Sequence, residues 1–152
     1  MPTVIRPAED QDASAWLRMR AALYEGEDLG FLEEEVRQIK ATGRLKDQPF
    51  ICLLALDEGT AVGFAEATIR SSAEDCATSP VVYLEGWYVE LNARGTGVGR
   101  ALADSVAQWG RGHGCREMAS DTRVDNDDSA RAHLALGFED SGVIRCFSKS
   151  LD

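Results

Sequence analysis

The alternation of apolar and polar residues predicts a chain in which strands and helices follow one another in a regular order. Short apolar runs rich in β-branched residues predict six strands, at residues 3–6, 49–56, 61–70, 81–89, 117–122 and 143–149. Apolar residues at the spacing of helical turns predict four helices, at residues 9–24, 28–42, 98–109 and 126–137. A mixed α/β fold (α+β) follows, in which helices cover a mixed sheet.

The size of the chain predicts one domain over residues 1–152, because 44% hydrophobic residues are enough for a single core. The turn-like sequence Asp57-Glu58-Gly59-Thr60 joins two of the predicted strands as a β-hairpin. Residues 71–80 show no periodicity and form the longest predicted loop, which is either functional or a disordered tip.

The stretch from Val81 to Trp109 carries the clearest chemical signal. Its apolar strand leads into a glycine-rich turn and then a helix, so backbone N–H groups and the positive end of the helix dipole gather there, as in an anion-binding site. The turn closes Gly97-Val98-Gly99-Arg100, without the Gly-Lys-Ser/Thr of a P-loop. The dinucleotide fingerprint is excluded as well, because no glycine lies three residues beyond Gly97.

The pattern that remains is Arg94-x-x-Gly97-x-Gly99 after a strand, which resembles the pyrophosphate loop of the GNAT superfamily of N-acetyltransferases. Farther along, Asn126 and the segment from Ser129 to Phe138 resemble the second GNAT motif. The resemblance implies the GNAT fold, with a central mixed, mostly antiparallel sheet, helices on both faces, and splayed fourth and fifth strands. It also implies acetyl-coenzyme A as the cosubstrate.

The charge balance narrows the range of partners. The chain has 26 acidic and 16 basic residues and a formal charge of −10. This argues against nucleic acid and anionic membranes and favours a cationic partner, unless the charge serves solubility alone. The cysteines are scattered, with no C-x-x-C and no His at metal-ligand spacing, so we expect reduced thiols, no metal and a cytoplasmic protein. No apolar stretch approaches the ~18 residues of a membrane span.

The GNAT resemblance assigns the cosubstrate residues. The backbone of Trp87, Tyr88 and Val89 is implied to bind the pantetheine and the acetyl group, with the Val89 N–H as the candidate oxyanion donor. The pyrophosphate is implied to lie on Arg94, Gly95, Thr96, Gly97, Val98, Gly99 and Arg100. Asn126 is implied for the pantetheine arm. Alternation by itself favours plain strand core for Trp87 and Val89.

Glu85 interrupts an otherwise apolar strand. Because burying a lone carboxylate costs several kcal/mol, we expect Glu85 to face a wet cleft or a cation. Asp121 is similarly placed at the end of the next strand, and the two carboxylates together would form an acidic acceptor site. The acidic residues Glu25, Glu27, Asp28 and Glu33-Glu34-Glu35 are interpreted as a solvated helix face rather than an extension of that site.

His133 occupies the place where many GNAT enzymes have a Tyr near the sulfur, often discussed as the proton donor to the thiolate. An imidazole, with an ordinary pKa of about 6.5, can serve in that role near neutrality. The alternative is a structural histidine on a short helix. His113, between two glycines, is expected to be a surface turn residue.

The segments Thr78-Ser79-Pro80, Leu84-Glu85-Gly86 and Ala119-Ser120-Asp121 resemble the aminoglycoside 6'-N-acetyltransferases more closely. In that family the residues matching Glu85 and Asp121 contact amines of the antibiotic. Tyr24 stands where these enzymes often have Trp, which implies an aromatic wall of the substrate site. Departures at Gly142 and Cys146 bear on the range of drugs accepted rather than on the reaction.

The leading hypothesis is therefore direct acetyl transfer from acetyl-coenzyme A to the 6'-amine of an aminoglycoside, an activity that gives antibiotic resistance. Glu85 acts there as an anchor, as a base through water, or as both. One alternative is a GNAT enzyme for another cationic amine, such as a polyamine or a protein N-terminus. Another is a non-catalytic module that binds a nucleotide or coenzyme. A homodimer is implied by the resemblance.

Overall fold

The two longest apolar runs form an antiparallel hairpin, β3 (Gln48–Asp57) and β4 (Thr60–Arg70), around which the sheet is built. The other strands are β1 (Val4–Pro7), β2 (Arg44–Leu45), β5 (Val81–Val89) and β6 (Met118–Ser120). The order is β1-β3-β4-β5-β6, with β2 paired to β3, and only the β5–β6 pair is parallel among the described strands. The predicted mixed, mostly antiparallel sheet is confirmed.

The computed structural model describes residues 3–152, which form two compact units. The first unit ends at Ser120 and the second runs from Asp121 to Asp152. The first contains the sheet together with η1 (Asp10–Asp12), α1 (Ala13–Leu23), α2 (Leu29–Thr42), η2 (Leu91–Ala93) and α3 (Val98–Gly112). The second contains α4 (Asp127–Ala135). A single domain over residues 1–152 stays a prediction.

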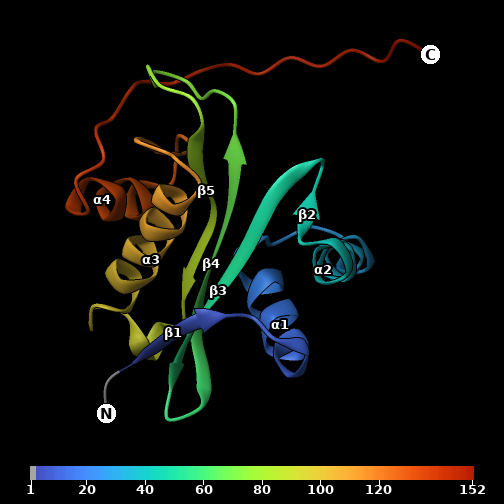
Figure 1. Cartoon of the computed structure of the whole chain (residues 1–152), viewed down its shortest axis with the longest axis vertical. Helices are drawn as coiled ribbons and strands as arrows, with labels where there is room; N and C mark the ends of the chain where they lie inside the picture. Colours follow the sequence, from blue (N-terminus) through green and yellow to red (C-terminus); the bar gives the residue numbers. More distant parts are fainter. Residues whose placement is uncertain (1–2) are drawn as a thin grey trace. The chain divides into compact units, whose positions relative to one another are not determined.

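Helices cover both faces of the sheet in the first unit (Figure 1). On one face, Trp16 and Met19 of α1 and Val36 and Ile39 of α2 pack against buried side chains of β3 and β4, among them Phe64. On the other face lies α3, whose Leu102 and Val106 are fully buried. The close approach of α3 to β5 depends on Gly110, since a Cβ there would lie 2.6 Å from Val82.

The ends of α2 follow the signals in the sequence. Asp28 is the N-cap, and its carboxylate accepts a hydrogen bond from the Phe31 N–H at 3.0 Å. At the other end Gly43 has a φ of 68°, the left-handed conformation that glycine adopts most readily. The predicted helix over residues 28–42 is thus confirmed to within one residue.

The parallel pairing of β5 with β6 is short. It joins Val82 to Met118, Tyr83 to Ala119 and Leu84 to Ser120, and it ends there. The pairing of β5 with β4, in contrast, continues to Val89. The second half of β5 therefore extends beyond its last pair with β6, as the predicted splay of these two strands requires.

The structure corrects the sequence interpretation near the C-terminus. The strand predicted at residues 143–149 is wrong, because in the described chain these residues have no helix or strand assignment (Figure 1). Val143 is 76% and Phe147 88% exposed. A strand needs a neighbour that takes up its backbone hydrogen bonds, and no described strand pairs with this segment. The strand predicted at residues 117–122 is also shorter than expected, with only Met118–Ser120 paired.

Two short elements, β2 and η2, are absent from the prediction, because segments of two or three residues carry no periodicity.

Within residues 3–152, no helix is both long and apolar enough to cross a membrane.

Candidate functional site

A β-bulge in β5 determines which face of the sheet the Glu85 side chain occupies. The register pairs Glu66 with Gly86 but Ala67 with Leu84, so Glu85 is an extra residue in β5 with no partner of its own on β4. Regular alternation would put Glu85 and Gly86 on opposite faces of the sheet. Instead both lie on the face covered by α1: a Cβ on Gly86 would meet the Tyr24 hydroxyl, and the Glu85 carboxylate contacts Thr68. The bulge thus places the Glu85 carboxylate on the α1 side of the sheet, although the rest of the strand is apolar.

One oxygen of Glu85 is firmly held. Its Oε1 accepts hydrogen bonds from Thr68 Oγ1 at 2.9 Å and from Arg70 Nη2 at 2.5 Å and Nε at 3.2 Å. The Arg70 guanidinium stacks on the Tyr83 ring, 3.5 Å from its centroid. The expectation that Glu85 faces a cation is therefore confirmed, and that cation is Arg70.

Glu85 lines a cavity of about 290 Å³ between the sheet and the α1–α2 region. Its lining includes acidic residues, basic residues and aromatic rings, namely Glu27, Glu35, Glu66, Glu85, Arg20, Lys46, Arg70, Tyr24, Phe31 and Phe50. A cavity with an aromatic wall and several carboxylates suits a cationic ligand.

A buried ion pair forms the floor of this cavity. Arg20 is 3% exposed and Glu66 is 0% exposed. Arg20 Nε donates to Glu66 Oε2 at 2.6 Å and Nη2 donates to Oε1 at 3.0 Å. Trp16 Nε1 donates to Oε2 at 2.7 Å. Because a buried carboxylate is tolerated only with such partners, this network fixes α1 against β4 beneath Glu85.

Tyr24 is the C-cap of α1 and lies over the bulge. Its hydroxyl is 3.5 Å from both Glu66 Oε1 and the Glu85 carbonyl oxygen. Burial, followed by the charge of Glu66, raises the pKa of Tyr24 well above its ordinary value, so the hydroxyl stays protonated and can donate. The structure thus places two of the predicted substrate residues, Tyr24 and Glu85, on one cavity.

The glycine-rich turn has the predicted form. Gly95 and Gly97 have φ values of 76° and 92°, and Gly97 is the N-cap of α3 without a side-chain cap. At both glycines a Cβ would meet nothing within 4 Å, so the turn is open. Thr96 Oγ1 donates to the Ala93 carbonyl at 2.5 Å and tightens the entry to the turn. Arg94 and Arg100 are exposed at its two ends.

Trp87 ties the strand to this turn. Its indole Nε1 donates to the Gly99 carbonyl at 3.0 Å, and a Cβ on Gly99 would lie 3.1 Å from the indole ring. Gly99 therefore allows α3 to approach the strand closely. Trp87 and Val89 are half-buried rather than core residues.

The backbone of Val89 faces away from β4. The next N–H, that of Glu90, donates to the Val62 carbonyl on β4 at 2.8 Å. Successive N–H groups of a strand point to opposite edges. The Val89 N–H therefore points to the edge of β5 that faces β6, at a position beyond the last residue pair of these two strands. The Val89 carbonyl accepts a hydrogen bond from Arg94 Nε at 2.8 Å. Within the first unit, a donor on this edge beyond the end of β6, near the glycine-rich start of α3, suits a ligand that has both a thioester and a diphosphate.

In the second unit, Asn126 and His133 lie on α4. Asn126 is the N-cap, and its side-chain oxygen accepts from the Ser129 N–H at 3.1 Å. His133 is half-buried, and its Nδ1 lies 2.7 Å from the Ser129 carbonyl oxygen. Because a carbonyl only accepts, Nδ1 carries a proton, and a proton given up from Nε2 requires the imidazolium form.

Asp121 is the first residue of the second unit and is exposed. Its pairing with Glu85 in one acceptor site stays a prediction. His113 is the C-cap of α3 and is exposed, with its ring tilted against that of Trp109 at a centroid distance of 4.7 Å, so its predicted place at a surface turn is confirmed.

The sequence interpretation missed Arg70, Thr68 and the Arg20–Glu66 pair. The available signal was polar residues within an apolar strand, because Glu66 and Thr68 alternate with apolar residues on β4. That alternation indicates a polar stripe on one face, but it does not identify which residues across the sheet complete it.

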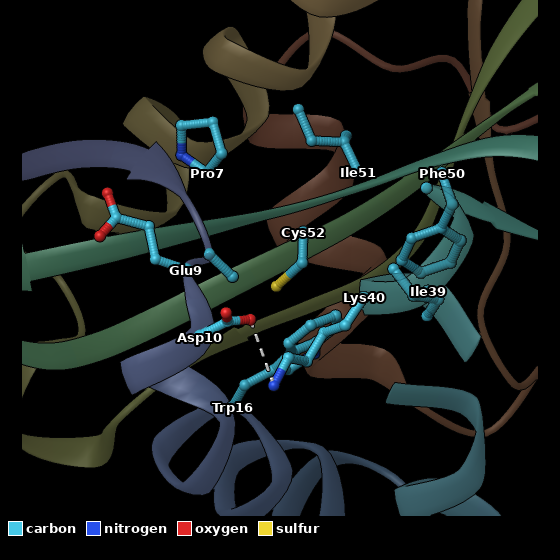
Figure 2. Close-up of a pocket in the computed structure, with 11 residues that line it drawn as sticks. Pro7, Glu9, Asp10, Trp16, Ile39, Lys40, Phe50, Ile51 and Cys52 are labelled. Carbon is cyan, nitrogen blue, oxygen red and sulfur yellow. Dashed lines mark ion pairs between the residues drawn. The ribbon is translucent and has the colours of Figure 1, made fainter. Parts of the chain in front are cut away.

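A second cavity, of about 230 Å³, lies between the end of β1, the first two helices and β3 (Figure 2). Lys40 and Asp10 form an ion pair of 3.4 Å across it. Burial raises the pKa of the Cys52 thiol there well above its ordinary value, so it stays protonated. Neither Glu85 nor Tyr24 lines this cavity, which we therefore assign no chemical role.

Comparison with known proteins agrees with the geometry. The model of the acetyltransferase (GNAT) family matches residues 13–138. An aminoglycoside N(6')-acetyltransferase type 1 from Klebsiella aerogenes is 40% identical over 148 residues, which cover 97% of each chain. The structure of AAC(6')-Iy in complex with a bisubstrate analog matches with a TM-score of 0.90 at 34% identity over 99% of each chain. The apo 6'-N-acetyltransferase AAC(6')-IG from Acinetobacter haemolyticus matches with a TM-score of 0.89 at 32% identity, covering 98% of this chain and 99% of the other.

Proposed function

Because the chain belongs to the GNAT acetyltransferase family, we propose that it transfers the acetyl group of acetyl-coenzyme A to the 6'-amine of aminoglycoside antibiotics and so gives resistance. One observation supports an aminoglycoside as the acceptor. A bulge directs Glu85 into an acidic cavity with aromatic walls, at the point where β5 extends beyond its last pair with β6. An aminoglycoside carries several ammonium groups, which such a cavity attracts.

The cosubstrate supplies the reactive thioester. Arg94, Arg100 and the open turn at Gly95 and Gly97 would hold its diphosphate, with Asn126 for the pantetheine arm. The outward N–H of Val89 would stabilise negative charge that develops on the acetyl oxygen. Glu85 would bind the acceptor ammonium, as an anchor or as a base through water, and Asp121 would add a second carboxylate.

Direct transfer is supported by the positions of the cysteines, because none of the four falls on a motif position where a covalent intermediate would need it. Burial raises the pKa of both Cys52 and Cys115, which lowers the fraction of reactive thiolate. A covalent acetyl-enzyme trapped with acetyl-coenzyme A alone would contradict direct transfer.

His133 is the proposed proton donor to the departing thiolate. A His133→Gln variant should lose most of its kcat while the KM for acetyl-coenzyme A stays the same, since the ring is assigned to proton transfer and not to binding. A variant with unchanged kcat would leave His133 a structural role at its hydrogen bond to Ser129.

A thiol-release assay over a panel of aminoglycosides tests the activity. The enzyme should release free coenzyme A from acetyl-coenzyme A when the acceptor has a 6'-amine, and it should release none when the acceptor lacks this amine. Faster turnover of spermidine than of kanamycin would favour another cationic amine as the substrate. Tight coenzyme A binding without thiol release from any amine would indicate a binding module.

We also propose that the protein is a cytoplasmic homodimer. The apolar side chains Val143, Ile144 and Phe147 are exposed in the single chain, on the segment 143–149 whose pattern predicts a strand. A second copy would supply the missing neighbour. Light scattering should give twice the mass of one chain, and truncation after Gly142 should reduce it to one.

A further inference from the structure

Glu35 differs from the other acidic residues of α2. Its side chain is 15% exposed, whereas those of Glu33 and Glu34 are 56% and 64% exposed. Glu33 and Glu34 both pair with Arg37 on the outer surface of the helix. Glu35 lines the cavity that also contains Glu85. The interpretation of residues 33–35 as one solvated face is therefore wrong for Glu35.

The charges around Glu35 do not balance. Arg20 Nη1 donates to Glu35 Oε1 at 3.0 Å, but the same guanidinium makes two hydrogen bonds with the buried Glu66. One positive charge thus serves two carboxylates. The second oxygen of Glu35 contacts no donor within the part of the chain that the structure describes.

The other basic residues of the cavity do not supply the missing charge. Arg70 is paired with Glu85. Lys46 lies in the turn after β2 and is exposed, and among the ion pairs of the described residues it takes part in none. The wall at Glu35 therefore keeps an excess negative charge that faces the cavity.

We propose that Glu35 binds a second ammonium group of the acceptor, so that the cavity selects substrates with at least one amine besides the one that is acetylated. This inference rests on the proposed function. Glu85 and Glu35 are held in the same way, because an arginine donates a hydrogen bond to Oε1 of each. The donor is Arg70 for Glu85 and Arg20 for Glu35. The arginines fix the carboxylates, and the remaining oxygens meet the substrate.

The test compares two acceptors with the same reacting group. Kanamycin carries a 6'-amine and further amines, whereas methyl 6-amino-6-deoxyglucoside carries that one amine alone. In a Glu35→Gln variant, the amide can still accept from Arg20 but the charge is lost. We expect kcat/KM for kanamycin to fall about tenfold or more, through KM, and kcat/KM for the monoamine to stay within about twofold.

Glu34→Gln is the matched control, because it removes the same charge from the same helix outside the cavity. It should leave both acceptors within about twofold. Glu35→Asp, which keeps the charge, should retain more kanamycin affinity than Glu35→Gln, and melting curves check that every variant is folded. Equal losses for Glu34→Gln and Glu35→Gln, or equal losses for both acceptors, would overturn the role of Glu35. A wild-type protein that neither binds kanamycin in calorimetry nor acetylates it would overturn the proposed function itself.

Discussion

Arg70 and Glu85 lie on neighbouring antiparallel strands and meet side chain to side chain, with Arg70 Nη2 2.5 Å from Glu85 Oε1. They are not register partners, since Arg70 pairs with Val81. The guanidinium instead reaches along β5 over the ring of Tyr83. This contact, together with Thr68, fixes one oxygen of Glu85 and determines which way the other faces.

An Arg70→Ala variant should weaken acceptor binding although it makes the cavity more acidic. Glu85 would keep only the hydrogen bond from Thr68 and would lose its fixed orientation. We expect the KM for kanamycin to rise about tenfold, with the KM for acetyl-coenzyme A unchanged, in steady-state kinetics.

Arg37→Ala is the control, because it removes an equal charge from the outer surface of α2, where the side chain is 63% exposed. A lower KM for kanamycin in Arg70→Ala would mean that Arg70 competes with the substrate for Glu85 and does not orient it.

Glu85→Gln should reduce kcat/KM for kanamycin by about a hundredfold, because an amide keeps the shape of the carboxylate but not its charge. The two roles of Glu85 separate in the kinetics. If it is an anchor, the loss appears as a higher KM; if it is a base, kcat falls and its pH profile loses the acidic limb. Activity equal to that of the wild type would remove Glu85 from the mechanism.

Gly97→Ala should weaken coenzyme binding. With a φ of 92°, an alanine at this position is strained by about 1–2 kcal/mol, and relief of that strain would move the N–H groups at the start of α3. Calorimetry should show a Kd for coenzyme A at least about fivefold higher.

Gly43→Ala provides the comparison, because Gly43 has a φ of 68° and ends α2 far along the chain from the turn. It should lower the melting temperature and leave the Kd for coenzyme A unchanged. A similar Kd in both variants would contradict a role for the turn in binding.

The ion pair between Arg6 and Asp12 predicts a pH-dependent part of the stability. Arg6 Nη1 donates to Asp12 Oδ2 at 2.6 Å, and this bond lowers the pKa of Asp12 below its ordinary value of 3.8. The stabilisation is therefore present above pH 3.8 and is lost as the pH falls through the lowered pKa. In urea titrations, Asp12→Asn should cost about 1–2 kcal/mol at pH 7 and progressively less below pH 3.8.

Asp10→Asn controls for the loss of charge, because the Asp10 side chain is 93% exposed. It should change the free energy of unfolding by less than about 0.5 kcal/mol, both at pH 7 and below pH 3.8. A cost for Asp12→Asn that does not vary with pH would mean that packing, and not the ion pair, is lost.

Local signals in the sequence were enough to predict most elements. The cap Asp28 and the terminator Gly43 fix the ends of α2, because capping needs only neighbouring residues. The strand predicted at residues 143–149 failed for the converse reason, since a strand exists only with a partner and its pattern does not say where that partner lies.

The sequence by itself determined the order of the longer elements up to α4, the glycine-rich turn, and that Glu85 needed a cation or water, because each depends on local conformation or on the cost of burying charge. Only the tertiary structure decided that a bulge aims Glu85 at Arg70, that Arg20 is shared by Glu66 and Glu35, and that Glu35 belongs to the cavity. These relationships join residues far apart in the chain, and the packing of α1 and α2 on the sheet is what brings them together.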